Sequence, residues 1–123
     1  DVAEFSKAVH AVIDGQVDWS CVVLQSFDFQ VLKYWHGIWP HVTLSALVEN
    51  ESPAFVLSEL GFTPAIYSSS YRQLDASRIA FSHANHMRVI PWTVNVREDI
   101  QKMIDLGVDG LITDYPNRSP KLP

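Results

Sequence analysis

Short apolar runs alternate along the chain with longer segments in which apolar residues recur at helical spacing. Val89 to Val94 is apolar and rich in β-branched residues, which is typical of a parallel strand covered on both faces. Leu111 to Thr113 is a second run of this kind. Between them, the 100–104 segment places its apolar residues on one helical face, so the pattern predicts strand, helix, strand.

Polar residues that stand just before the segments of helical spacing predict where helices begin. Asp28, Ser52 and Asp75 each precede a helical pattern and are predicted N-caps, because their side-chain oxygens can accept from free amides of the first turn. Asn95 with Glu98 three residues later resembles a capping box, which predicts a further helix start.

The predicted strands recur at an almost constant interval, about every 22 residues, as expected for repeated strand and helix units. This alternation implies right-handed crossovers and a parallel sheet, so the predicted fold class is α/β. Five such units fit a (β/α)8 TIM barrel, whose usual length is about 250 residues. Residues 1–123 would then be its C-terminal portion, with about five strands. An open doubly wound sheet is the alternative, which periodicity does not separate from a barrel. The five strands are predicted to start near Val22, Val42, Ala65, Arg88 and Gly110.

The chain begins at Asp1, without a methionine and already inside a helical pattern, so we expect a partial domain that lacks its N-terminal strands. An arc of five strands has two unpaired edges and an uncovered inner face. We therefore expect that the missing half, or a second copy, is needed to complete the barrel. Pro91 conflicts with its strand because proline cannot donate to a ladder, and we interpret it as a bulge that directs Trp92 towards the mouth.

Composition restricts the partners. The net charge is −5 and the nine Lys and Arg residues form no patch, which argues against a nucleic-acid partner. The single cysteine, Cys21, provides no internal disulfide and no thiol-based metal site. No apolar run approaches the roughly 20 residues that a transmembrane helix needs.

Candidate site residues stand at the ends of the predicted strands, because the carboxyl ends of parallel strands are where such folds bind ligands. Asp114 is one of these candidates, and its alternative role is to cap the following turn without contacting a ligand. If Trp92 points into the mouth, alternation places Ile90 in the interior and directs Val89 and Thr93 towards the helices. The candidates for polar contacts are Gln25, Glu49, Tyr67 and Asp114.

No catalytic or metal-binding residue is assigned. Magnesium and calcium need several clustered oxygen ligands, whereas the carboxylates here fall mostly at predicted helix caps and outer faces. The five histidines fall in helices or connecting turns, away from the strand ends where a catalytic acid would stand. His83 and His86 have the spacing of a helical metal pair, but a solvated helix end is the favoured interpretation.

Six segments carry a resemblance that extends over roughly residues 22–117. The most specific are Trp92-Thr-Val-Asn95 and Gly107-Val-Asp-Gly-Leu-Ile-Thr-Asp114, about 15 residues apart. The others are Val23-Leu-Gln-Ser-Phe-Asp28, Leu47-Val-Glu49, Leu60-Gly-Phe62 and Tyr71-Arg-Gln-Leu74. In this order and spacing they resemble the C-terminal half of the glycerophosphodiester phosphodiesterase family.

The resemblance implies a (β/α)8 barrel that uses a divalent cation, magnesium or calcium, to hydrolyse small-molecule glycerophosphodiesters to glycerol 3-phosphate and an alcohol. The family's His-Arg-Gly and Glu-Leu-Asp segments do not occur in these residues. We therefore expect the full-length protein to be this enzyme and the chain alone to be inactive. The resemblance also supports Phe27 and Trp92 as apolar walls around the glycerol and headgroup, with plain core packing as the alternative.

Two other hypotheses remain. A non-catalytic half-barrel that binds a partner or pairs with itself would account for the missing chemistry. An unrelated barrel enzyme with a phosphate site after its last two strands would not account for the register of the six segments.

Overall fold

Four parallel strands and five α-helices make up residues 1–120, the part of the chain that the computed structural model describes. Neighbours in the sheet are also neighbours in the chain, in the order β1-β2-β3-β4. The strands are β1 (Val23–Ser26), β2 (Thr43–Leu47), β3 (Ile66–Ser68) and β4 (Arg88–Val89). The helices are α1 (Val2–Ile13), α2 (Phe29–Ile38), α3 (Pro53–Leu60), α4 (Ala76–Ala84) and α5 (Arg97–Leu106), with short 3-10 helices at Trp19–Cys21, Tyr71–Gln73 and Pro116–Arg118.

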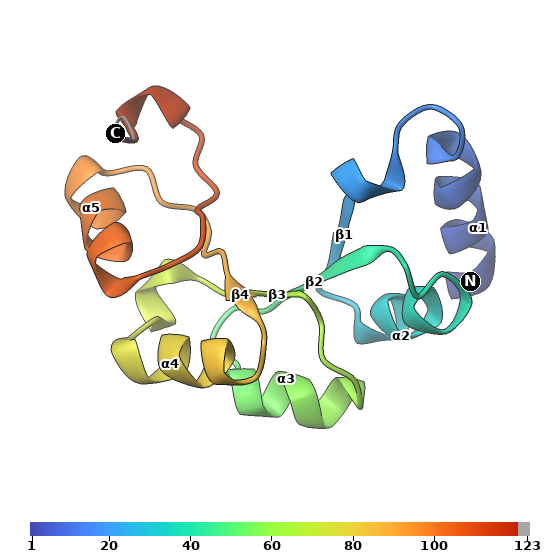
Figure 1. The fold of residues 1–123 in the computed structure, drawn as a ribbon, viewed down its shortest axis with the longest axis horizontal. Coiled ribbons are helices and arrows are strands. Elements are labelled where there is room, and N and C mark those ends of the chain that lie inside the picture. Colours follow the sequence, from blue (N-terminus) through green and yellow to red (C-terminus); the bar gives the residue numbers. More distant parts are fainter. Residues whose placement is uncertain (121–123) are drawn as a thin grey trace.

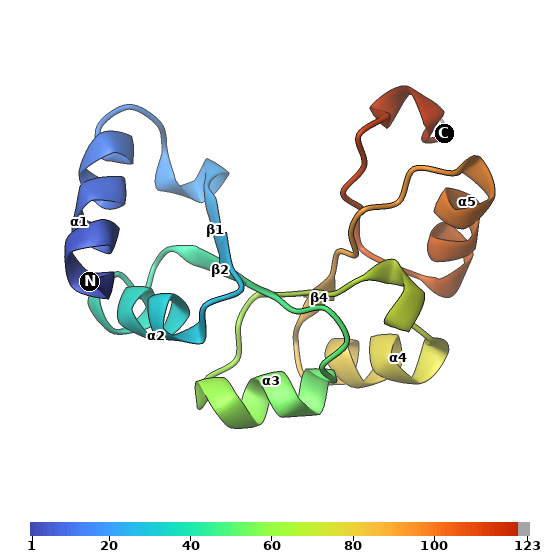
Figure 2. The same cartoon turned by 180° about the vertical axis from the view of Figure 1, so that it is seen from behind.

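The elements form an open arc, with the helices along its outer side and the strands along its inner side (Figure 1). The view from behind shows the same arrangement, with α1 and α5 on opposite arms of the arc (Figure 2). A doubly wound sheet reverses its strand order and carries helices on both faces. The uninterrupted order and the one-sided helices exclude that alternative for these four strands.

The three predicted N-caps upstream of β4 are confirmed. Asp28 accepts a hydrogen bond from the Gln30 amide at 2.9 Å, and Ser52 accepts one from Phe55 at 3.1 Å. Asp75 accepts from the amide of the third residue of α4 at 2.8 Å. Each cap satisfies a first-turn amide that has no partner within its helix, which is why these helices begin where the sequence indicates.

The core lies between the sheet and the helices. The register pairs Ala46 with Tyr67 and Tyr67 with Val89, so these side chains share the helix-facing side of the sheet. All three are fully buried, as is Trp35 of α2, and they belong to one apolar cluster. Burial of this surface is the main stabilising term for the arc.

The predicted fifth strand at residues 111–113 is not a regular strand, and β4 is shorter than expected. The chain still runs beside β4, because the Asp109 amide donates to the Val89 carbonyl and the Ile112 amide to the Pro91 carbonyl, each at 2.9 Å. Because proline has no amide hydrogen, Pro91 cannot donate a hydrogen bond back to the segment of Asp109 and Ile112. The ladder between the two segments is therefore incomplete. The same proline interrupts β4, although Trp92 resumes pairing through its amide to the Ser69 carbonyl.

Replacing Tyr67 by phenylalanine should lower the free energy of unfolding by about 1 kcal/mol. The buried hydroxyl donates to the Glu51 carbonyl and accepts from Arg78, and phenylalanine would leave these groups without that partner. Burial raises the pKa of Tyr67, although bonds from Ser69 and Arg78 oppose the rise. Chemical denaturation measures the change, and Tyr34→Phe, at a partly exposed tyrosine, is the control. Equal losses in the two variants would contradict the prediction.

Candidate functional site

Two aromatic side chains meet at the carboxyl edge of the sheet. Phe27 follows β1 and Trp92 follows β4, and their ring centroids lie 5.8 Å apart in an edge-to-face arrangement. The Trp92 indole N–H donates to the Ser68 carbonyl at 3.0 Å, which fixes the orientation of the ring. The structure therefore brings together Phe27 and Trp92, the two residues that were predicted to form apolar walls of the substrate pocket.

A hollow of about 480 Å³ opens beside Phe27 at this edge. Glu49 lines it together with Glu51 and Phe55, so two of the predicted site residues, Phe27 and Glu49, border the same space. The Glu49 amide donates to the Glu51 carboxylate at 3.1 Å, and this bond shapes the turn between β2 and α3.

Gln25 lies elsewhere, on the inner face of the arc. It borders a second, mostly apolar hollow of about 270 Å³ with Val23 and Ile90, among others. Ile90 thus faces the interior and Val89 faces the helices, as alternation from Trp92 predicted. Thr93 is exposed instead of packing towards the helices, so that expectation is wrong. Beyond Pro91 the regular alternation of a strand no longer holds.

Tyr67 does not lie at the mouth. Its strand partners Ala46 and Val89 point towards the helices, and the register turns Tyr67 the same way. The side chain is fully buried and bonded to the Glu51 carbonyl. The prediction that Tyr67 contacts a ligand is wrong. In a strand of three residues every residue is close to the strand end, so alternation, and not that closeness, decides which side of the sheet a residue faces.

Asn95 joins two chain segments that run side by side, the one after β4 and the one after α5, and does not cap α5. Its side-chain oxygen accepts from the Thr113 hydroxyl at 3.1 Å and from the Asp114 amide at 3.0 Å. Its side-chain nitrogen donates to the Asp114 carboxylate at 3.0 Å. The N-cap of α5 is Val96, without a side-chain bond, so the predicted capping box is wrong. The neighbouring segment offers the Asn95 side chain several hydrogen-bond partners at once, and these bonds replace the local helix cap.

Replacing Asn95 by alanine should lower the free energy of unfolding by about 1 kcal/mol, because the half-buried amide makes several bonds that water replaces in part. The segment after Thr113 should also become more sensitive to protease. Denaturant titration and limited proteolysis measure these effects. Asn50→Ala is the control, since Asn50 is exposed and accepts from Arg78 through its main chain. A variant that is indistinguishable from this control would refute the role of Asn95.

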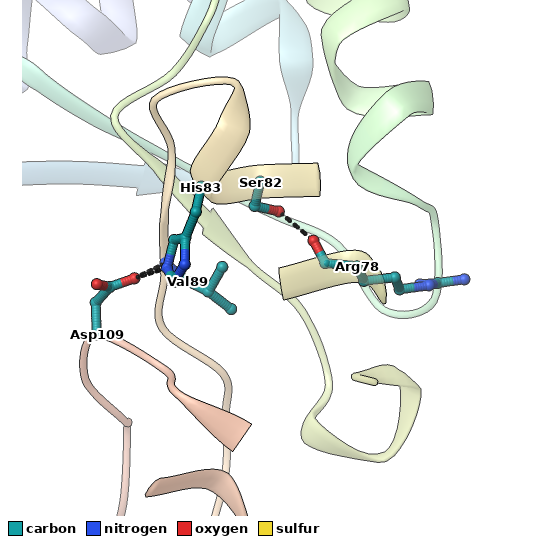
Figure 3. A network of polar contacts seen from close by, with 5 residues as sticks. All are labelled: Arg78, Ser82, His83, Val89 and Asp109. Carbon is teal, nitrogen blue, oxygen red and sulfur yellow. Dashed lines mark hydrogen bonds and ion pairs between the residues drawn. The ribbon is translucent and has the colours of Figure 1, made fainter. Parts of the chain in front are cut away.

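A polar network lies at the opposite, amino edge of the sheet (Figure 3). One Asp109 carboxylate oxygen accepts from the Val89 amide at 2.7 Å and lies 2.8 Å from the His83 ring nitrogen. Partial burial alone would raise the pKa of Asp109, but the bonds to Val89 and His83 outweigh it and the pKa is lowered. The network ties α4 to the chain beyond α5 and is separate from the mouth.

A divalent cation does not fit the described residues. Among residues 1–120, no group of three or more His, Cys, Asp and Glu side chains is arranged to hold a metal ion. A magnesium or calcium site needs more oxygen ligands than one or two such side chains supply. In the same residues, no helix has the length and apolar character needed to cross a membrane.

A family profile and individual relatives point to the same protein family. The glycerophosphoryl diester phosphodiesterase family profile matches residues 2–118. Over 106 residues the chain is 31% identical to a glycerophosphodiester phosphodiesterase of Bacillus altitudinis, covering 82% of this chain and 42% of that protein. A glycerophosphodiester phosphodiesterase of Bacillus subtilis (strain 168) is 26% identical over 100 residues, covering 78% of this chain and 34% of that one. The chain thus spans less than half the length of these relatives.

Solved structures share the fold. A protein of Silicibacter pomeroyi DSS-3, whose name assigns it to the same family, superposes with a TM-score of 0.85 at 28% identity, over 95% of this chain and 42% of that one. An Oleispira antarctica phosphodiesterase, solved with the product sn-glycerol-3-phosphate, gives a TM-score of 0.83 at 19% identity, over 95% and 48% of the two chains. The profile match and the Bacillus altitudinis relative identify this chain as a member of the glycerophosphoryl diester phosphodiesterase family.

Proposed function

We propose that this chain is the C-terminal portion of a metal-dependent phosphodiesterase that hydrolyses glycerophosphodiesters to glycerol 3-phosphate and an alcohol. The observation that carries the proposal is the contact between Phe27 and Trp92 at the carboxyl edge of the sheet, in a chain of this family. Ligand sites of parallel α/β folds lie at that edge. A relative in fold binds the product sn-glycerol-3-phosphate, which agrees with this substrate class.

The open arc supports a partial barrel. The strands follow one another in order with helices outside, as in (β/α)8 barrels. On the inner face, Val23 of the edge strand β1 is 48% exposed. Further strands beside β1 would cover this apolar surface and pair its free edge. We infer that residues 1–123 form one part of a domain that other strands complete.

In this proposal the chain supplies the wall of the pocket. The Phe27 and Trp92 rings exclude water from one side of the substrate and orient its glycerol and alcohol portions. Glu49 offers a carboxylate at the rim, and the Asn95–Asp114 pair holds the neighbouring turn. The family's divalent cation would supply charge neutralisation at the phosphate, and its ligands would come from residues outside this chain.

The test is release of glycerol 3-phosphate from glycerophosphodiesters by the complete gene product, with and without a metal chelator. We expect turnover that the chelator abolishes and no turnover by residues 1–123 alone. Turnover by residues 1–123 alone would refute the assignment of the metal ligands to other strands. A complete protein that releases no glycerol 3-phosphate would refute the proposed function.

The open inner face also favours a second candidate, a half-barrel that pairs with itself. Two arcs could cover each other's apolar hollow around Val23 and Ile90 and pair their free strand edges. This candidate predicts that purified residues 1–123 form a dimer that unfolds cooperatively. A monomeric mass by light scattering would eliminate it.

A further inference from the structure

Arg118 joins the last 3-10 helix to the chain segment that carries Trp92. Its guanidinium donates to the main-chain carbonyl of Asn95 at 2.9 Å, three residues after Trp92. The same guanidinium lies over the Tyr115 ring, 3.8 Å from the ring centroid. Figure 1 shows this 3-10 helix on the same arm of the arc as α5. Residues that are 23 positions apart are thus joined at the carboxyl edge of the sheet.

The chemistry of this contact suits it to fix an orientation. An arginine guanidinium is planar and always charged, and stacking on a ring leaves its in-plane N–H groups free to donate. A hydrogen bond from a charged donor is also about twice as strong as a neutral one. Arg118 is partly buried, although arginine side chains favour exposure. The Tyr115 ring therefore directs the guanidinium towards the Asn95 carbonyl.

The main chain from Trp92 to Asn95 is fixed at both ends. The Trp92 carbonyl accepts from the Tyr71 amide at 3.0 Å, which ties Trp92 to the chain after β3. At the other end, the Asn95 side chain bonds to the chain after α5, and its carbonyl accepts from Arg118. This segment lies beyond β4 and has no regular strand to set its path. The position of the Asn95 main chain therefore contributes to the direction of the Trp92 side chain.

We propose that Arg118 is a positioning residue, which orients the Trp92 ring through the Asn95 carbonyl and contacts no substrate atom itself. The inference rests on the proposed function, in which Trp92 borders the substrate. Small displacements of groups that orient a substrate can cost large factors in rate. Loss of the Arg118 contact should therefore affect the reaction only as long as the Trp92 ring is present.

A double-mutant cycle in the complete gene product tests this dependence. We expect Arg118→Ala to lower kcat/KM for a glycerophosphodiester about tenfold in the parent and less than about threefold in a Trp92→Ala background. Arg118→Lys should lose most of the same factor, because an ammonium group lacks the planar face and the fixed donor geometry of a guanidinium. Arg88→Ala, at an exposed arginine of β4, is the control and should leave kcat/KM unchanged.

Hydrogen–deuterium exchange of the same variants measures the contact without turnover. Arg118→Ala should speed exchange at the amides of residues 93–96 several-fold. The amides of β2 and β3 should exchange as in the parent, which establishes that the variant is folded. Tyr115→Leu removes the ring face and should show part of this effect, whereas Tyr115→Phe retains the face and should match the parent.

Equal factors for Arg118→Ala in the two backgrounds would overturn the inference, because Arg118 would then act independently of Trp92. Unchanged exchange over residues 93–96 would overturn it as well. Hydrolysis with a smaller factor in the Trp92→Ala background supports both the phosphodiesterase and the positioning role. Faster exchange in Arg118→Ala of a gene product that hydrolyses no diester would reject the proposed function and retain the contact that fixes the segment.

Discussion

Replacing Asp109 by alanine should lower the free energy of unfolding by about 2–3 kcal/mol. One carboxylate oxygen accepts from both the Val89 amide and His83, so truncation removes two contacts at once. Val89 is fully buried, and its amide would be left without a partner on that side of β4. Chemical denaturation of the two proteins measures the difference.

Asp109→Asn separates the acceptor from the charge, since it can still accept from Val89. We expect it to lose about half as much stability as the alanine variant, because hydrogen bonds to charged groups are about twice as strong as neutral ones. Asp105→Ala is a control, because this exposed carboxylate accepts from Gln101 within α5. A loss no larger than that of the control would mean that water replaces the Asp109 carboxylate.

The lowered pKa of Asp109 fixes the direction of the pH dependence. The folded state favours the charged carboxylate, so the contribution is present above the unfolded pKa of about 3.9 and is lost as the pH falls through the lower folded value. The stability difference between the parent protein and Asp109→Asn should therefore shrink as the pH falls below about 4. A difference that grows towards acid pH would contradict this.

If the complete gene product has the proposed phosphodiesterase activity, replacing Trp92 by alanine should lower its kcat/KM about 10- to 100-fold, because fully burying a large apolar side chain contributes about 1.5–3 kcal/mol. The change removes the contact with Phe27 and the bond to the Ser68 carbonyl. Trp92→Phe keeps an apolar wall and loses only the indole donor, so it should lose less. Steady-state kinetics on a glycerophosphodiester measures both variants.

Phe81→Ala is the control for this series, since Phe81 is a partly exposed aromatic residue of α4 outside the hollow. It should leave kcat/KM unchanged. Near-ultraviolet circular dichroism and thermal denaturation establish that Trp92→Ala stays folded. A folded Trp92→Ala enzyme with the parent's kcat/KM would show that Trp92 packs against Phe27 without forming part of the pocket.

Local patterns determined much of this structure. The short apolar runs specified four strands, and the residues Asp28, Ser52 and Asp75 specified three helix starts, because caps and periodicity act within a few residues. The six matching segments also led to the correct family. Pro91 is the informative exception, because its missing amide hydrogen leaves the fifth segment beside β4 without a complete ladder.

By itself, the sequence determined the fold class, the family and the Phe27–Trp92 candidates. Only the tertiary structure decided which side each polar strand residue faces and which partner it binds. Tyr67 turned to the core because its register partners face the helices, and Asn95 bonded to Asp114 instead of capping α5. The physical reason is that register and the pairing of distant segments set these choices, and both depend on contacts far apart in the chain.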